Sequence, residues 1–362
     1  MTKRSLLIPF AFVGTALLPM MSLAQQYQET DLVSNAAGNG AKFANAQLVN
    51  PWGMARSSSG PWWVSDQRSG VATLYDGQGN AQPLVVTIQR AGQNPVAGPT
   101  GIVFNGSQDF DVLPGKPALF IFATRDGTVA AWNPMANPTV AIEKVKPAPG
   151  SVLTGATIAQ NKDNRFLYVA DVHEGKVRVF DNHFSAVATA PGAFEDQTLP
   201  KNFVPFNVQN IGDAVYVTYA EQNQAKNFVT TGTGLGAVDI FAPNGVLLQR
   251  LERGSWFNAP WGVVIASTDF GGFSHSILVG QFGSGEILAF DAVTGRFQDR
   301  LRHQDGRVIS IPGLWDIAFG AGNANSGGPN QLFFDAGVNK GKGGVFGFFA
   351  PVAGDLTQGN DQ

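Results

Sequence analysis

One hairpin pattern recurs along this chain, and it constrains the fold more than any other feature. Its clearest copy is residues 165–181, where two runs of β-branched and aromatic residues flank a turn that contains Gly175. Such runs around a glycine-bearing break are typical of a β-hairpin. Further copies begin at Pro61, Ala118 and Ser276, and looser ones at Val215 and Gln331. The sequence therefore predicts a repeat architecture built from hairpins.

A short motif precedes each hairpin: a Pro or Thr, then an aromatic or small residue, then usually Gly. The last position of the motif falls at Gly53, Gly101, Gly155, Asn207, Gly262 and Asp316, which are 48 to 55 residues apart. A period near fifty, with about four strand-like runs in each repeat, is typical of propeller blades. We therefore expect an all-β fold, a six-bladed β-propeller of four-stranded blades, with blades that start near residues 48, 98, 152, 204, 258 and 312.

The ends of the repeat array suggest how the ring closes. The last repeat has no outer strand of its own after residues 344–350, and the β-like segment 27–34 has no repeat of its own. We expect this N-terminal segment to complete the last blade. Residues 221–236 interrupt a hairpin and are polar and rich in Gly and Thr, so a long surface loop is expected there. The tail, residues 351–362, is expected to be flexible.

The first residues have the three parts of a secretory signal peptide. Lys3 and Arg4 form a basic start, residues 6–18 are mostly apolar, and residues 22–24 read Ser-Leu-Ala. Cleavage after Ala24 would leave residues 25–350 as a single propeller domain. We expect an exported protein, periplasmic or extracellular, with no membrane span after cleavage.

Composition narrows the classes of partner and chemistry. The formal net charge is −3 with no basic cluster, which argues against nucleic acid as a partner. The chain has no Cys, which excludes disulfides, thiolate metal sites and cysteine nucleophiles. No GxSxG elbow or P-loop is present. The expected partner is a small molecule of unknown identity or an extracytoplasmic protein.

The repeats resemble NHL-type propeller repeats, in which a run such as LYVAD (167–171) is followed by a Gly turn and a strand ending in FD (180–181). Segments such as LVNPWGMA (48–55), NAPWGVVIA (258–266) and GLWDIAFG (313–320) are similar to those of an uncharacterised family of secreted bacterial β-propeller proteins. The resemblance implies the fold and export, and it supplies no catalytic residues. Asp316 stands where the pattern favours Gly, and Arg125 where it favours an acidic residue.

Four aromatic residues occupy equivalent positions in the predicted inner strands: Trp52, Phe206, Trp261 and Trp315. One interpretation is a channel mouth lined with rings that stack on a ligand. The other is that the rings fill the axis or pack between blades as core.

Polar residues near the predicted axis raise two further possibilities. Asn50, Asn207, Asn258 and Asp316, with Asp171 nearby, offer the oxygen ligands that Ca²⁺ prefers, although Asn in such positions is commonly a turn residue. Propeller enzymes of the regucalcin and lactonase type hold a divalent cation with such side chains. His173, beside Asp171 in a hairpin turn, is a candidate general base or a solvated turn histidine.

Two hypotheses about function follow, and the sequence leaves both open. In the first, the protein is a ligand-binding or protein-binding scaffold of unknown biochemical activity. In the alternative, it is a divalent-metal-dependent hydrolase or lyase with an axial site, for which Asp171, His173 and Asp316 are the candidate catalytic residues.

Overall fold

The computed structural model describes residues 25–89 and 97–352. The expected signal peptide, and the expected flexible tail from residue 353 onward, lie outside these ranges. The described chain is all-β apart from the short helices η1 (Gly271–Phe273) and α1 (Val338–Gly341). No helix in the described ranges has both the length and the apolar character needed to cross a membrane.

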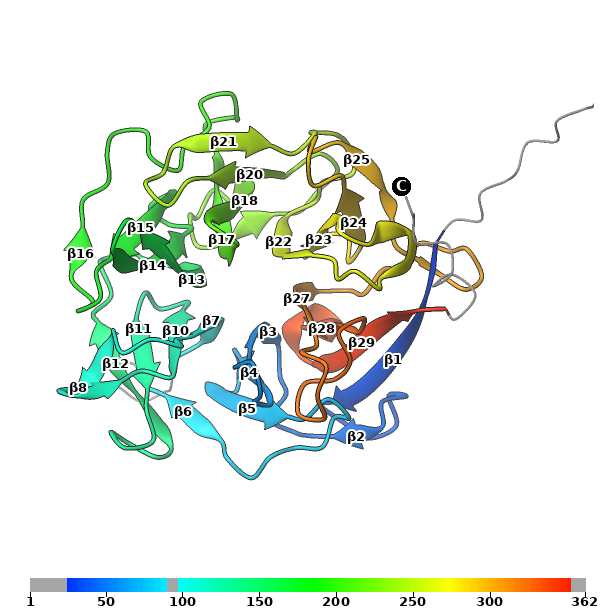
Figure 1. Ribbon diagram of the computed structural model, residues 1–362, viewed down its shortest axis with the longest axis horizontal. Helices are drawn as coiled ribbons and strands as arrows, with labels where there is room; N and C mark the ends of the chain where they lie inside the picture. Colours follow the sequence, from blue (N-terminus) through cyan, green and yellow to red (C-terminus); the bar gives the residue numbers. More distant parts are fainter. Residues whose placement is uncertain (1–24, 90–96, 353–362) are drawn as a thin grey trace, which may run out of the picture.

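The sheets stand around a central axis like the blades of a propeller (Figure 1). The strands nearest the axis contact one another in sequence order, and the last of them also contacts the first. They are β3 (Pro51–Ala55), β7 (Pro99–Phe104), β13 (Leu153–Asn161), β17 (Phe203–Ile211), β22 (Pro260–Ile265) and β27 (Leu314–Phe319). The all-β, propeller-like prediction is therefore confirmed.

From each inner strand the chain meanders outward through antiparallel neighbours. The second strands are β4 (Trp62–Asp66), β10 (Phe120–Thr124), β14 (Asn164–Asp171), β18 (Ala214–Gln222), β23 (Ile277–Gln281) and β28 (Leu332–Ala336). The third strands are β5 (Val71–Tyr75), β11 (Val129–Trp132), β15 (Lys176–Phe180), β20 (Ala237–Phe241), β24 (Ile287–Phe290) and β29 (Val345–Pro351). The repeated hairpin of the sequence is the pair of second and third strands.

The outermost strands are β6 (Val86–Ile88), β12 (Val140–Val145), β16 (Ala186–Val187), β21 (Leu247–Arg250), β25 (Phe297–Arg300) and β1 (Gln26–Ser34). Parallel pairing of β6 with β12 joins two of the meanders into one eight-stranded sheet. Short additional strands are β2 (Phe43–Ala44), β8 (Asp111–Leu113), β9 (Lys116–Pro117), β19 (Val229–Thr230) and β26 (Arg302–His303).

The glycines of the repeated motif lie where neighbouring inner strands touch. A Cβ atom on Gly53 would lie 2.7 Å from the Thr100 carbonyl oxygen, and one on Gly101 would lie 2.5 Å from the Ala156 nitrogen. Both distances are too short for a side chain, so glycine is required for the inner strands to approach this closely.

Two repeats have a polar residue in place of this glycine, and its side chain bonds to the next inner strand. Asn207 Nδ2 donates to the Trp261 carbonyl oxygen at 2.9 Å. The Met54 backbone N–H donates to Asp316 Oδ2 at 2.9 Å. The second bond links β27 to β3, the last and first inner strands of the chain.

The N-terminal strand pairs where the sequence predicted. β1 runs antiparallel to β29, from Tyr27 opposite Pro351 to Ser34 opposite Val345, with one register shift after Asp31. Tyr27 is fully buried, its ring stacks on Phe270 with centroids 4.6 Å apart, and its hydroxyl donates to the Phe270 carbonyl oxygen. The strand is therefore fixed both to its sheet and to the neighbouring β22–β23 connection.

We expect Tyr27→Ala to lower the free energy of unfolding by about 3 kcal/mol or more, because it removes a large buried aromatic side chain. Gln28→Ala, on the exposed face of the same strand, is the matched control. Chemical denaturation of both variants measures the difference. Equal stability of the two variants would show that β1 is not an integral strand.

Buried carboxyl groups gather where the first and last meanders meet. Burial raises the pKa of Asp316 to about 7, against the smaller opposing effect of the backbone N–H groups of Met54 and Ile317. Burial also holds the pKa of Asp66 and of Asp335 well above the usual range. Each of these groups binds a proton more tightly in the folded state than in the unfolded chain.

Stability should therefore fall as the pH rises from about 4 to about 7, since over that range the unfolded chain loses the Asp316 proton that the folded state retains. Asp316→Asn should flatten the pH dependence in this window, by at most about 1.4 kcal/mol for each pKa unit of the shift. Urea unfolding at several pH values measures it, with the exposed Asp163→Asn as control. Parallel profiles for wild type and Asp316→Asn would contradict the assignment.

Candidate functional site

Aromatic side chains fill the centre of the ring. Trp315 has Trp52 stacked on it with centroids 3.6 Å apart, and Phe282 stacked on it at 4.2 Å. Trp261 meets the Trp315 ring edge-on at 6.0 Å. We call this group the aromatic cluster, and its members are Trp52, Phe206, Phe228, Trp261, Phe282 and Trp315. The structure thus brings together all four aromatic residues that the sequence placed at equivalent inner-strand positions.

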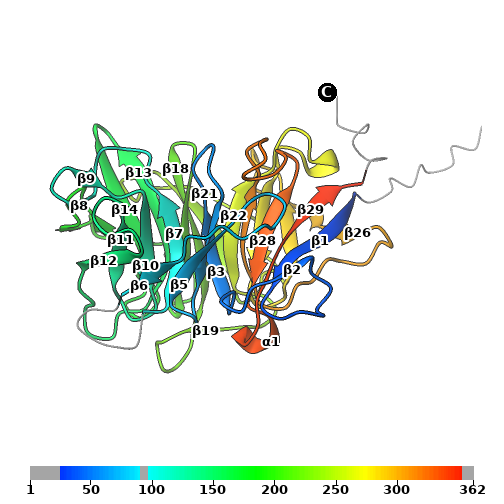
Figure 2. The ribbon, with the colours of Figure 1, turned by 90° about the horizontal axis from the view of Figure 1, so that it is seen from below.

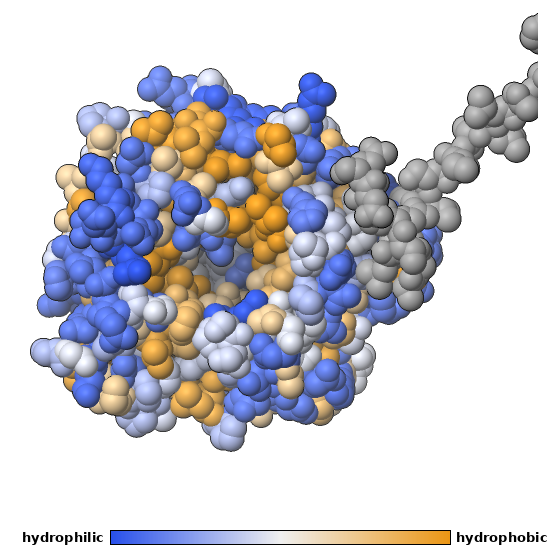
Figure 3. All heavy atoms as spheres, viewed as in Figure 1, coloured by the Kyte–Doolittle hydropathy of each residue, from blue (hydrophilic) through white to orange (hydrophobic). Residues whose placement is uncertain are grey.

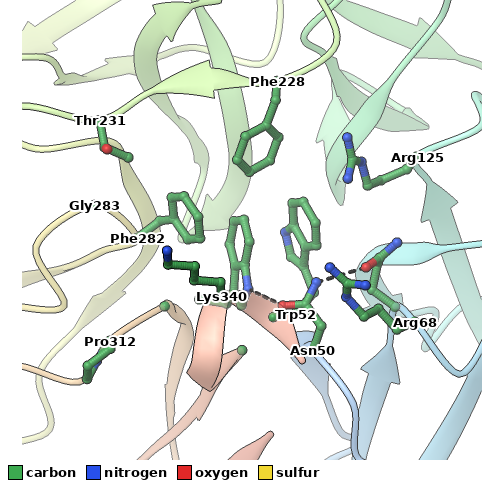
Figure 4. Close-up of a pocket in the computed structure, with 15 residues that line it drawn as sticks. Asn50, Trp52, Arg68, Arg125, Phe228, Thr231, Phe282, Gly283, Pro312 and Lys340 are labelled. Atoms are coloured by element: carbon green, nitrogen blue, oxygen red, sulfur yellow. Dashed lines mark hydrogen bonds between the residues drawn. The ribbon is translucent and has the colours of Figure 1, made fainter. Parts of the chain in front are cut away.

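A pocket of about 550 Å³ opens above this cluster, on the face where the inner strands begin (Figure 4). This is the side of the molecule on which α1 and β19 project in Figure 2. We call it the axial pocket. Its rings are Trp52, Phe228, Phe282 and Trp315, and its polar and charged side chains are Asn50, Gln67, Arg68, Arg125, Thr231 and Lys340. Phe206 and Trp261 belong to the cluster but do not line the pocket.

The lining residues outside the inner strands come mainly from one type of connection, the one between the second and third strands of a meander. Arg68 lies in the β4–β5 turn, Arg125 in the β10–β11 turn and Phe282 in the β23–β24 turn. Lys340 lies in α1, between β28 and β29. The repeat thus presents several equivalent turns to the same pocket, each with a different side chain.

An amide pair fixes the wall of the pocket beside Trp315. Asn50 Nδ2 donates to Gln67 Oε1 at 2.8 Å, and the indole N–H of Trp315 donates to Asn50 Oδ1 at 3.3 Å (Figure 4). Asn50 has a positive φ of 52°, a conformation that Asn tolerates better than most residues. These bonds hold the Trp315 ring in place at the base of the pocket.

The charged groups that line the axial pocket are cations: Arg68, Arg125 and Lys340. Partial burial, and to a lesser degree the charge of Arg68, lowers the pKa of the Arg125 guanidinium. Arg125 Nη2 donates to the Asn227 carbonyl oxygen at 3.1 Å, and its guanidinium lies over the Phe228 ring at 5.2 Å. The pocket therefore combines an apolar base with a positive rim.

The four predicted metal-ligand residues have other partners. Asn50 and Asn207 bond as described above, and the Gly232 N–H donates to Asn258 Oδ1 at 2.7 Å. The carboxylate of Asp316 accepts the N–H groups of Met54 and Ile317. Of the four, only Asn50 lines the axial pocket. Within residues 25–89 and 97–352, no three His, Asp or Glu side chains form a group that would hold a metal ion.

Asp171 and His173 organise a turn. Asp171 is fully buried, Ser151 Oγ donates to its Oδ2 at 2.6 Å, and the N–H groups of His173 and Glu174 donate to its Oδ1. The His173 Nδ1 atom lies 3.1 Å from the Lys226 carbonyl oxygen. Neither residue lines the axial pocket.

The loop predicted for residues 221–236 lies mostly at the surface, and it also contributes to the site. The segment contains β19, and it places Phe228 among the rings of the aromatic cluster and Thr231 at the pocket rim. The polar composition of the segment did not indicate this role, because the contact with the aromatic cluster depends on a single aromatic residue, Phe228. Arg68, Arg125, Phe282 and Lys340 were not identified as site residues either. Alignment of the hairpin turns would have found them, and the unusual Arg125 was the one visible sign.

A second pocket, of about 480 Å³, lies at the opposite end of the inner strands. Figure 3 shows the hollow at the centre of this face, with hydrophobic residues around it. Its lining includes Met54, Ile102, Val264 and Phe319, and the Arg56 guanidinium donates to the Phe319 carbonyl oxygen there. We call it the opposite pocket.

No protein-family model matches the chain. The uncharacterized protein R648 of Acanthamoeba polyphaga mimivirus is 30% identical to it over 325 residues, which cover 87% of this chain and 78% of the viral protein.

Solved structures share the fold at low sequence identity. A virginiamycin B lyase from Staphylococcus aureus matches with a TM-score of 0.52 and 11% identity, over 90% of this chain and 99% of the lyase. A protein of unknown function from Bacteroides thetaiotaomicron matches with a TM-score of 0.54 and 13% identity, over 90% of this chain and 76% of that protein. At this level of identity the likeness shows the β-propeller fold alone.

We expect calcium at about 1 mM, a range in which extracellular calcium modules bind, to leave the melting temperature unchanged relative to a chelator control. The reason is that the candidate oxygens of Asn50, Asn258 and Asp316 already accept hydrogen bonds within the protein. Differential scanning fluorimetry measures it. A calcium-dependent rise that Asp316→Asn abolishes would contradict this interpretation.

Proposed function

The chain belongs to the family of the mimivirus protein R648, and from that premise we propose that it is an exported six-bladed β-propeller that binds a small organic ligand in the axial pocket. The relative reported above is an uncharacterized protein, so the support for binding comes from the pocket itself. In this proposal, residues 1–24 are a cleaved signal peptide and residues 25–350 are one propeller domain. The site of action would then be the periplasm or the cell exterior.

The strand order supports six blades closed by the N-terminal strand. Each meander begins at an inner strand and proceeds outward, and the meander that begins with β27 takes β1 as its outer strand. A blade assembled from both ends of the chain joins the first and last repeats, which gives the ring a fixed diameter and the axial pocket a fixed shape.

The observation that carries the binding proposal is the pocket of about 550 Å³ based on stacked rings. Its volume falls in the range of about 300–1,000 Å³ that is typical of small-molecule sites. The Trp52 and Trp315 rings are almost fully buried by their neighbours, so their positions are set before any ligand arrives. The half-buried rings Phe228 and Phe282 pack on this pair, so a flat or apolar ligand group placed against Phe228 and Phe282 would lose little free energy to rearrangement of the protein.

The alternative, a divalent-metal-dependent hydrolase or lyase, has less support. It requires the oxygens of Asn50, Asn207, Asn258 and Asp316 to face one point, whereas the side chains of Asn207 and Asp316 each bond to the inner strand that follows their own. We therefore favour a binding role over a catalytic one.

Thermal shift measurements against a library of small organic molecules test the proposal. We expect ligands that raise the melting temperature, because a ligand present at about 100 times its Kd stabilises the folded state by about 2.7 kcal/mol. Thr231→Trp should weaken their binding at least about tenfold, a loss of about 1.4 kcal/mol, because the new ring would narrow the pocket at an exposed rim position.

Thr233→Trp is the matched control, since Thr233 is an exposed residue of the same loop and does not line the axial pocket. It should bind the ligands as the wild type does. Ligands that stabilise Thr231→Trp and wild type equally would place binding elsewhere and refute the proposal.

A further inference from the structure

We propose that the ligand of the axial pocket is an organic anion, a flat apolar group that carries a carboxylate or phosphate held by Arg68 and Arg125. This inference rests on the proposed function, because it names the class of ligand for the same pocket. In this proposal the anionic group lies at the two arginines, and the flat group lies against rings of the aromatic cluster.

Arg68 and Arg125 lack a carboxylate partner, as Arg56 and Arg296 also do among the described residues, but they are the two arginines of the described chain that line the axial pocket. Within the described residues, other arginines lie within 4 Å of a carboxylate: Arg165, Arg178, Arg250, Arg253, Arg300, Arg302 and Arg307. Neither Arg68 nor Arg125 has such a partner there, and the described lining of the axial pocket includes no Asp or Glu. An unpaired guanidinium pair at a pocket is the arrangement that binds a carboxylate or phosphate from outside, with charge-assisted hydrogen bonds.

The positive charges of the two guanidinium groups also repel each other. Arg125 is partly buried, and the charge of Arg68 further disfavours its ionised form. An anionic group bound at both side chains would offset this repulsion, and the partial burial of Arg125 would strengthen its attraction to the anion.

The aromatic rings of the axial pocket would bind the flat part of the ligand. In Figure 4, Arg68 and Arg125 lie on one side of the stacked rings, and Lys340 lies on the other beside Phe282. Phe228 and Phe282 are the half-buried rings of the pocket, so a ligand with its charge at the arginines would place its flat part against these two rings. The indole N–H of Trp52 is buried and has no acceptor among the described residues.

The backbone at Lys340, at the rim of the pocket, has an unfavourable conformation. Asn339 and Lys340 are consecutive non-glycine residues with φ of 54° and 58°, in the left-handed region. This conformation is unfavourable for ordinary residues and persists where the surrounding structure enforces it, often at ligand sites. Here it places a third cation at the rim of the pocket.

Binding of matched naphthalene compounds to the purified protein tests the inference. The set comprises 2-naphthoate, 2-naphthyl phosphate, the neutral 2-naphthamide and the cationic 2-naphthylmethylamine, with Kd measured by isothermal titration calorimetry. We expect an anion to bind at least about tenfold more tightly than the amide, consistent with hydrogen bonds to charged groups. The advantage should shrink at about 0.5 M salt. The ratio of naphthoate to naphthyl phosphate affinity distinguishes the two anion classes.

Variants that each remove one arginine charge show which residues bind the anion. Arg68→Gln and Arg125→Gln should each weaken binding of the preferred anion about tenfold and leave amide binding unchanged. Arg296→Gln removes an exposed arginine that does not line the pocket and should change neither affinity. Circular dichroism melts of all three variants confirm that they are folded.

The outcomes separate this inference from the proposed function. If the amide or the amine binds as tightly as the anions, and Thr231→Trp blocks it, the pocket is a ligand site but the anion inference is overturned. The same holds if the library yields only neutral or cationic ligands that Thr231→Trp blocks. If neither the library nor the naphthalene set binds, both the proposed function and this inference are overturned.

Discussion

Ring stacking at the axis, above all of Trp52 on Trp315, is the contact on which the rest of this structure depends. The two rings come from β3 and β27, the first and last inner strands, and their centroids lie 3.6 Å apart. They therefore fill space at the axis and join the two ends of the repeat array in one contact. The same pair forms the base of the axial pocket. Packing at the axis, ring closure and the base of the axial pocket therefore depend on the same two residues.

The packing of the inner strands determines the shape of the axial pocket. Glycine at Gly53 and Gly101 lets the inner strands lie side by side, which narrows the axis until the aromatic rings meet. Where glycine is replaced, Asn207 and Asp316 bond across to the next strand instead. The Asp316 bond lies at the junction of the first and last meanders, so the protonation of that carboxyl group is linked to the stability of the junction. Packing and hydrogen bonds therefore hold the walls of the axial pocket, and the chain has no Cys that could form a disulfide.

The sequence predicted the all-β, propeller-like fold and the pairing of the N-terminal strand, and it predicted the site only in part. The repeated hairpin, the glycine spacing and the segment 27–34, which has no repeat of its own, were informative because each is a local pattern that recurs or fails to recur along the chain. The four inner-strand rings were likewise found by aligning repeats. The rim was missed since Arg68, Arg125 and Lys340 lie in turns, where charged residues are ordinary, and only the closed ring brings those turns together. Phe228 was missed because a single ring in a polar loop has no periodicity.

A crystal structure of the protein with a bound naphthalene carboxylate or phosphate tests the central claim most directly, since that claim concerns position. The account predicts the ligand in the axial pocket, its rings against Phe228 and Phe282, and its anionic oxygens at roughly 2.7–2.9 Å from the guanidinium nitrogens of Arg68 and Arg125. Ligand density in the opposite pocket, with the axial pocket holding only solvent, would contradict it.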